Sequence, residues 1–161
     1  MKKFGFILIM LVFGTVAKVS AQSRTEFLLE KGWKFTREDD PQFRLPSYDD
    51  GKWQSVTVPH DWAIYGPFSA KNDVQEVAIT QDGQEGWYRL NFQVPGFAKG
   101  KKVALIFDGT MSHPQVYLNG TKVGEWVYGY NSFHLDVTSA LKEGDNLLAV
   151  RLENLPESSR W

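Results

Sequence analysis

Acidic side chains in polar segments are the first residues of this chain that could carry chemistry. The acids outside clear strand patterns are Asp39, Asp40, Asp49, Asp50, Asp61, Glu76 and Glu85. General acid–base catalysis needs two such groups at a fixed separation, and the sequence alone does not pair them. Adjacent acids followed by glycine, as in Asp49-Asp50-Gly51, are typical turn formers, so we interpret that pair as part of a turn.

Other catalytic and cofactor signatures are absent from the sequence. The three histidines, His60, His113 and His134, are too scattered for a helical ligand pair, and the chain has no cysteine. We therefore predict no metal site. The Gly-x-Ser-x-Gly elbow, the Walker loop and the dinucleotide fingerprint do not occur. We expect no catalytic residue and no cofactor in this chain.

The chain is rich in aromatic side chains, with 6 Trp, 6 Tyr and 11 Phe. Such rings either fill a core or, beside a loop, stack on the apolar face of a ligand such as a sugar. We expect Trp53, Trp87 and Trp126 to belong to the core. Trp62 and Trp161 lie outside strand patterns and are better candidates for a binding site.

Composition limits the possible classes of protein. The length of 161 residues suits about one domain. The 42% hydrophobic and 23% charged residues are near globular averages, and the lack of cysteine excludes a disulfide-stapled fold. A net charge of −1 without a basic stripe argues against nucleic acid or an anionic membrane as partner.

Strand patterns fill the chain from residue 53 onward. Apolar residues take every second position over residues 87–94, which is typical of a strand with one buried face. They are Tyr88, Leu90, Phe92 and Val94. Residues 103–107 are apolar at every position, which predicts a strand covered on both faces. Residues 147–152 form the last expected strand.

A hairpin is predicted around Asn119-Gly120, the strongest short hairpin signal, between strands over 116–118 and 123–127. Asn119-Gly120-Thr121 also matches a glycosylation acceptor. Residues 138–142 suggest a helical turn or a tight corner. Six or more short strands without a helical stripe predict an all-β fold, a β-sandwich or jelly roll.

Two regions do not fit this pattern of short strands separated by turns. Residues 39–51 are polar and rich in turn signals, and residues 63–86 contain only 77–79 as a possible strand. Structureless connections longer than ~12–15 residues are usually functional or disordered.

The first 21 residues are predicted to be a cleavable signal peptide. Lys2 and Lys3 precede an apolar run over 4–16, and small residues at 19–21 predict cleavage after Ala21. The apolar run is too short to span a bilayer. The mature domain would comprise residues 22–161, be periplasmic or secreted, and not be held in a membrane.

The motifs of the mature chain resemble the N-terminal sugar-binding domain of glycoside hydrolase family 2, the β-galactosidase and β-glucuronidase group. They are Gly32-Trp33-Lys34-Phe35, Tyr48-Asp49-Asp50-Gly51-Lys52-Trp53, Val56-Thr57-Val58-Pro59-His60-Asp61-Trp62, Gly86-Trp87-Tyr88-Arg89, Phe107-Asp108-Gly109, Val116-Tyr117-Leu118-Asn119-Gly120, Gly144-Asp145-Asn146-Leu147-Leu148-Ala149-Val150 and Ser159-Arg160-Trp161. Taken in this order, they cover nearly all of the mature chain.

This resemblance implies a jelly-roll domain of a larger enzyme. Family members add an immunoglobulin-like domain and a TIM barrel whose two glutamates perform retaining hydrolysis. The barrel's Asn-Glu pair does not occur here, so the resemblance implies a fragment that hydrolyses nothing alone. Its implied partners are a β-linked oligosaccharide or glycoside and the missing C-terminal domains. Galactose, glucuronic acid and mannose remain open as the sugar.

Four residues are implied to contact the sugar: Asp61 and Trp62 in the Pro-His-Asp-Trp segment, and Arg160 and Trp161 near the end of the sequence. An acid and an arginine can read sugar hydroxyls through charge-assisted hydrogen bonds. Alternatively, Asp61 caps a turn and Arg160 forms an interdomain ion pair. A free-standing carbohydrate-binding module or lectin, or a purely structural domain, would suit the same fold.

Overall fold

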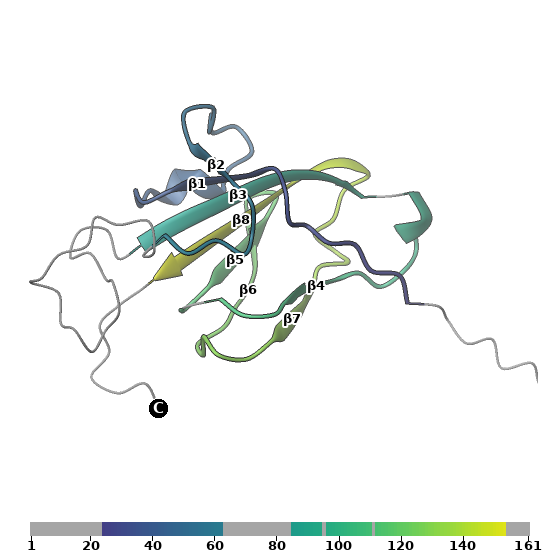
Figure 1. The fold of residues 1–161 in the computed structure, drawn as a ribbon. Helices are drawn as coiled ribbons and strands as arrows, with labels where there is room; N and C mark the ends of the chain where they lie inside the picture. Colours follow the sequence, from purple (N-terminus) through teal and green to yellow (C-terminus); the bar gives the residue numbers. More distant parts are fainter. Residues whose placement is uncertain (1–23, 63–84, 95, 111, 154–161) are drawn as a thin grey trace, which may run out of the picture.

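The computed structural model describes residues 24–62, 85–94, 96–110 and 112–153, and these form two antiparallel sheets (Figure 1). The larger sheet has the strand order β2 (Gln54–Val56), β1 (Trp33–Thr36), β3 (Glu85–Val94), β8 (Gly144–Glu153), β5 (Gln115–Leu118) and β6 (Thr121–Glu125). The smaller sheet pairs β4 (Ala104–Phe107) with β7 (Phe133–Asp136). The short 3-10 helices η1 (Pro41–Arg44) and η2 (Gly96–Ala98) are the helical elements of the described residues. The predicted all-β sandwich is confirmed.

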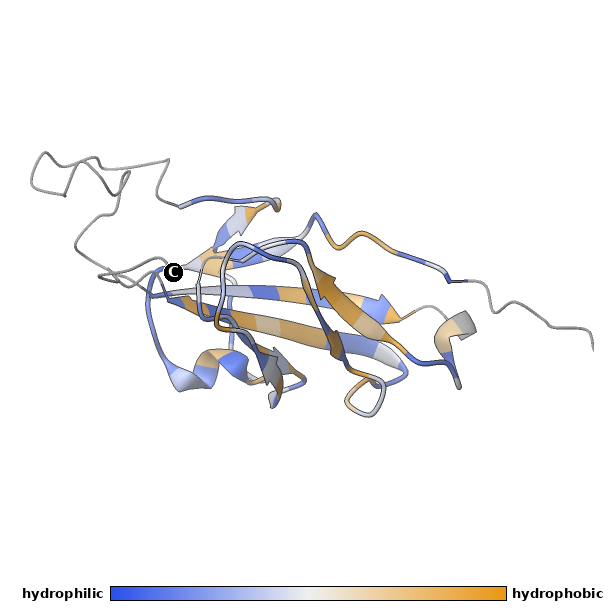
Figure 2. Cartoon of the chain, turned by 90° about the horizontal axis from the view of Figure 1, so that it is seen from below, coloured by the Kyte–Doolittle hydropathy of each residue, from blue (hydrophilic) through white to orange (hydrophobic). Residues whose placement is uncertain are grey.

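The main core lies between the two sheets, and hydrophobic residues run along the strands of both (Figure 2). Its buried members are Trp33, Phe35, Val56, Tyr88, Leu90, Val116, Leu118, Val137, Leu148, Val150 and Leu152. A Cβ on Gly124 of β6 would lie 2.5 Å from Leu135 Cδ2 of the smaller sheet. Glycine at that position therefore lets the two sheets approach.

Strand β4 is covered on one face only, so the prediction of two covered faces is wrong. Leu105 and Phe107 face the core, whereas Ala104 and Ile106 are exposed, Ile106 by 51%. The smaller sheet has no described layer outside it, and a continuous apolar run therefore does not ensure burial on both faces.

Strand β3 departs from its prediction in the opposite direction, because residues 86–90 are buried on both faces. The second face is covered by η1 and the turns that follow it, over residues 41–53. This outer cluster consists of Phe43, Trp53, Trp87 and Ala149, with Tyr48 and Tyr117 packed against it. Trp53 and Trp87 are thus buried as predicted, but on the face of the larger sheet that points away from the sandwich interior.

A buried arginine fixes this outer cover. Arg89, only 2% exposed, donates from Nη1 to Phe43 O (3.0 Å) and from Nη2 to Tyr48 O (3.2 Å). Its Nε lies 2.9 Å from Asp50 Oδ2, an ion-pair contact that departs from good hydrogen-bond geometry. The guanidinium also lies over the rings of Tyr48 and Trp53. Burial lowers the pKa of Arg89, while Asp50 opposes that shift.

The predicted turns are present. Asn119 (φ 53°) and Gly120 (φ 87°) join β5 to β6, and both have the positive φ that a two-residue hairpin turn requires. The Asn119 amide donates to Ala140 O and Asn146 Oδ1, and its Oδ1 accepts from Leu147 N. These bonds account for the asparagine without a glycan.

Two further predicted turns are confirmed by hydrogen bonds. The corner over 138–142 is closed by bonds from Ala140 N and Leu141 N to Val137 O. At the Asp49-Asp50-Gly51 turn, Gly51 N donates to Asp49 Oδ1 at 2.9 Å.

Within the described part of the chain, no helix has the length and hydrophobicity needed to span a bilayer. The predicted signal peptide and residues 63–84 lie outside the described residues.

Candidate functional site at the loop end of the sandwich

Several connections meet at one end of the sandwich, which we call the loop end (Figure 1). The pairing of Glu85 with Glu153 places the start of β3 beside the end of β8. The pairing of Gln115 with Arg151 and with Glu125 brings the β4–β5 and β6–β7 connections to the same end. The loop end therefore comprises residues 108–110, 112–113 and 126–132, together with residues 60–62, which run back along β3 through the contacts of His60 with Tyr88 and of Trp62 with Gly86.

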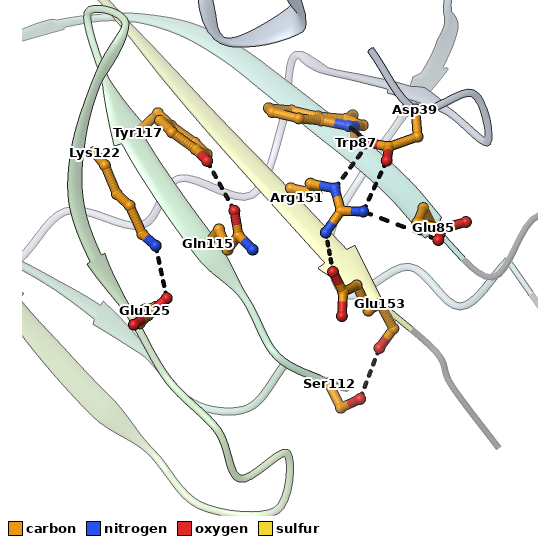
Figure 3. A network of polar contacts seen from close by, with 10 residues as sticks. All are labelled: Asp39, Glu85, Trp87, Ser112, Gln115, Tyr117, Lys122, Glu125, Arg151 and Glu153. Carbon is orange, nitrogen blue, oxygen red and sulfur yellow. Dashed lines mark hydrogen bonds and ion pairs between the residues drawn. The ribbon is translucent and has the colours of Figure 1, made fainter. Parts of the chain in front are cut away.

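Backbone hydrogen bonds tie these connections together. Ser112 and Glu153 exchange N–H to carbonyl bonds of 2.9 and 3.0 Å, and the Ser112 hydroxyl also donates to Glu153 O (Figure 3). Trp126 N donates to Pro114 O at 3.1 Å. A Cβ on Gly109 would lie 3.7 Å from Gly129 O, so these two loops lie side by side. His113 adopts φ 47°, a left-handed conformation that is uncommon outside glycine.

The Pro-His-Asp-Trp segment is anchored on the inner face of the larger sheet. The Val58–Pro59 bond is cis, and His60 Nδ1 lies 2.8 Å from the Tyr88 hydroxyl. The His60 ring also meets Phe35 edge to face, with centroids 4.9 Å apart. Burial lowers the pKa of His60 and raises that of Tyr88. This polar contact is therefore made by two neutral groups near neutral pH.

Trp62 has a packing role that the sequence did not predict. Its half-buried ring stacks on Phe35 with centroids 5.4 Å apart and planes 16° apart. A Cβ on Gly86 would lie 2.8 Å from Trp62 Cζ3, so the glycine at the start of β3 makes room for the indole. One face of this ring is thus covered by protein. Whether Trp62 also contacts a sugar stays a prediction.

The other predicted site residues differ in what the structure says of them. Asp61 is exposed beside Trp62, and its charge adds to the rise in the pKa of Tyr88. Arg160 and Trp161 lie outside the described residues. Glu153, the last described residue, pairs with Glu85 next to the glycine that Trp62 contacts. The chain thus leaves β8 at the end of the sandwich where Asp61 and Trp62 lie.

Most of the acids that the sequence left unpaired turn out to have structural partners. Asp40 caps η1 by accepting from Gln42 N. Asp39 accepts bidentate hydrogen bonds from Arg151, at 2.8 Å from Nε and 2.7 Å from Nη2 (Figure 3). It also accepts a hydrogen bond from Trp87 Nε1. The hydrogen bonds to Arg151 lower the pKa of Asp39.

The same arginine neutralises two further acids at the loop end. Arg151 Nη1 pairs with Glu153, and Nη2 lies 3.9 Å from Glu85 (Figure 3). Hydrogen bonds to Asp39 raise the pKa of Arg151, so its charge is permanent. These carboxylates therefore hold the ends of β3 and β8 together rather than acting as a proton-transfer pair. Glu76 lies outside the described residues, and within those residues no three His, Cys, Asp or Glu gather as metal ligands.

The β6–β7 connection, residues 126–131, presents rings that the sequence analysis did not select as a site; we call it the aromatic loop. Trp126 is 37% exposed, so its assignment to the core is wrong in part. Its ring stacks on buried Phe133, with centroids 5.4 Å apart and planes 7° apart. Tyr128 and Tyr130 are 48% and 58% exposed. The sequence does contain a signal for this site: Trp126, Tyr128 and Tyr130 take alternate positions around Gly129, between two strands.

The space between the sheets opens to solvent at the loop end. Core residues such as Leu148 line its interior, and His60, Asp108, Tyr128 and Tyr130 line it at the loop end. The geometry thus offers aromatic rings, hydroxyls and a carboxylate at this opening, which are groups that line small-molecule binding sites.

The family model for the glycosyl hydrolase 2 galactose-binding domain-like domain matches residues 33–160. The chain belongs to this family. Its fold and its sequence motifs agree, so the resemblance inferred from the sequence is confirmed.

Relatives of this glycosyl hydrolase 2 domain are much longer proteins. The chain is 38% identical over 145 residues to a beta-galactosidase of Bacteroides ovatus, which covers 89% of this chain and 17% of that protein. It is 32% identical over 162 residues to a putative beta-glucuronidase of Formosa agariphila. That match covers 100% of this chain and 16% of the relative. A solved glycosyl hydrolase family 2 member from Bacteroides cellulosilyticus superposes with a TM-score of 0.73 at 34% identity, covering 82% of this chain and 18% of that one.

The chain therefore spans about a sixth of the length of the curated relatives that it matches. It corresponds to one domain of multidomain glycosyl hydrolase family 2 proteins, and the loop end of that domain carries the exposed rings of Tyr128 and Tyr130 and the exposed carboxylate of Asp108.

Proposed function

We propose that this chain is the N-terminal, non-catalytic domain of an exported, β-galactosidase-like glycoside hydrolase. The proposal is supported by the family match, and by the pairing of Asp39, Glu85 and Glu153 with Arg151 at the ends of β3 and β8, which gives these acids a structural role. Residues 1–21 would direct export to the periplasm or the exterior and be cleaved after Ala21.

The whole enzyme would release terminal β-linked sugars by a retaining mechanism. Its nucleophile and its acid/base would be two glutamates about 5 Å apart, carried by a domain beyond this sequence. The domain described here would supply a wall of the sugar pocket, with Asp61, Trp62, Arg160 and Trp161 as the residues that the family resemblance assigns to it.

The test compares two purified proteins: the 161-residue chain, and the product of the longest open reading frame that contains it. We expect the longer protein to hydrolyse a nitrophenyl β-galactoside, releasing the β-anomer first by proton NMR, and the chain alone to show no turnover. Saturable hydrolysis by the chain would contradict the non-catalytic role. A longer protein inactive on every β-glycoside would contradict the enzyme assignment.

A second candidate is a free-standing carbohydrate-binding module, which the exposed rings of the aromatic loop favour. A reading frame that stops after Trp161, together with sugar binding by the chain, would support this candidate over the first.

A further inference from the structure

The aromatic loop is held on a rigid support. Phe133 is 4% exposed and stacks on both Phe107 (4.8 Å, 7°) and Trp126 (5.4 Å, 7°). Two parallel neighbours on a buried ring place Trp126 at the outer end of the stack. Trp126 Nε1 also donates to Asn131 Oδ1 at 2.9 Å, which closes the loop across five residues. The loop therefore starts and ends at fixed points.

Between these points, Tyr128 and Tyr130 are exposed and contact each other. The Tyr128 and Tyr130 centroids are 5.7 Å apart and their planes are inclined by 56°. With 48% and 58% of their surface exposed, neither ring is buried in the core. The loop that carries Asp108 lies alongside them, because Gly109 approaches Gly129 O. An exposed carboxylate thus stands on the neighbouring loop.

The charge of the two loops beside the tyrosines selects among possible ligands. Over residues 108–110 and 126–132, the charged side chain is the exposed carboxylate of Asp108, and these two segments carry no lysine or arginine. A phosphate or carboxylate ligand bound between these loops would meet like charge. A neutral, polyhydroxylated ligand would instead donate a hydroxyl to Asp108.

We propose that Tyr128 and Tyr130 form a platform that binds a neutral β-hexopyranoside, with Asp108 accepting from its hydroxyls. A β-galactoside carries several C–H groups on one ring face, and such a face packs on an aromatic ring while the hydroxyls point sideways. The proposal rests on the proposed function for the class of ligand. It adds the residues that contact the sugar and a preference for neutral sugars over glucuronides.

The test is a titration of the 161-residue chain, followed by the NMR shifts of the tryptophan indole N–H groups. The ligands are methyl β-D-galactopyranoside and methyl β-D-glucuronide. We expect saturable binding of the galactoside and binding of the glucuronide weaker by about threefold or more, since that corresponds to ~0.7 kcal/mol of charge repulsion. Asp108→Asn should reduce this difference in affinity between the two sugars, because it removes the negative charge.

Ring variants locate the platform. Tyr128→Ser and Tyr130→Ser should each weaken galactoside binding by about fivefold, equivalent to losing a ring contact of ~1 kcal/mol. Tyr128→Phe and Tyr130→Phe keep the ring face and should remain within about twofold of the wild type. Ile106→Ser, at a comparably exposed apolar position on β4, is the matched control and should leave binding unchanged. Unaltered near-ultraviolet circular dichroism would verify folding of each variant.

Several outcomes would overturn the platform. The first is the absence of saturable galactoside binding at tens of millimolar sugar. The second is a loss of galactoside affinity in Ile106→Ser as large as in the tyrosine variants. The third is glucuronide binding as tight as galactoside binding. Concentration-dependent dimerisation abolished by Tyr128→Ser would instead identify the loop as a contact between protein chains. Because the chain alone is titrated, the result is separate from the hydrolysis assay that decides the proposed function.

Discussion

Replacing Arg89 with methionine should loosen residues 41–53 from the outer face of the larger sheet. The guanidinium is 2% exposed and holds this segment through Phe43 O, Tyr48 O and Asp50 Oδ2. Methionine fills part of the same volume but provides no donor and no charge. The substitution therefore removes the polar anchor while keeping much of the apolar contact.

The expected loss of stability follows from what remains behind. Removing one partner of a buried ion pair costs about 3–5 kcal/mol. The Asp50 side chain is 17% exposed, so water can reach part of the stranded carboxylate and lower that cost. The Phe43 and Tyr48 carbonyls each lose a charged donor, which adds a penalty of about 1–3 kcal/mol where a group stays dry. We expect about 3–4 kcal/mol in all, a large fraction of the ~5–15 kcal/mol typical of a domain.

Urea unfolding of the wild type, Arg89→Met, Asp50→Asn and the double variant would measure this as a double-mutant cycle. The double variant should be more stable than the sum of the single effects, because it no longer buries an unpaired carboxylate. Arg44→Met is the matched control: Arg44 is exposed, and its replacement should change stability by less than about 0.5 kcal/mol. An Arg89→Met variant within about 1 kcal/mol of the wild type, or strict additivity in the cycle, would refute the reasoning.

Three further substitutions test the fold and the site. Gly86→Ala should destabilise the chain by about 1–3 kcal/mol and shift tryptophan fluorescence, because its Cβ would press on Trp62; unchanged emission would contradict that contact. Asn119→Ala should cost about 2–4 kcal/mol in urea unfolding by leaving backbone groups unpaired at a positive φ, whereas Asn119→Asp keeps the acceptor and should lose less. Burial lowers the pKa of His60, so the unfolded chain takes up its proton first and stability should fall as the pH drops below about 6.5. His60→Gln should flatten the melting temperature between about pH 7 and pH 5, and an unchanged slope would exclude His60 as its source.

Local features of the fold could be predicted from the sequence. The Asn119-Gly120 hairpin, the corner after Val137 and the turn at Asp49 depend on backbone preferences of adjacent residues, and each lies where it was expected. Alternation predicted β3, and the family motifs could be read in order along the chain, whereas β1 lies before residue 53, where no strand was predicted. These features involve neighbours in sequence, so a short stretch of sequence specifies them.

Which faces of the strands are covered was decided only in the tertiary structure. The alternation around Arg89 predicted one open face, but residues 41–53 fold back over it and bury a charge. The unbroken apolar run of β4 predicted two covered faces, and Ile106 is exposed because no described segment lies outside it.

The same distinction holds for the candidate site. The sequence by itself determined that the chain is an all-β domain of the glycoside hydrolase family 2 type, and it marked Asp61 and Trp62. Only the tertiary structure placed Asp108, Tyr128 and Tyr130 with them at the loop end, because antiparallel pairing across β5, β6 and β8 brings connections that are distant in sequence to the same end. Coverage of a face and the meeting of loops both depend on contacts between residues far apart in the chain, and such contacts leave no periodic trace in the sequence.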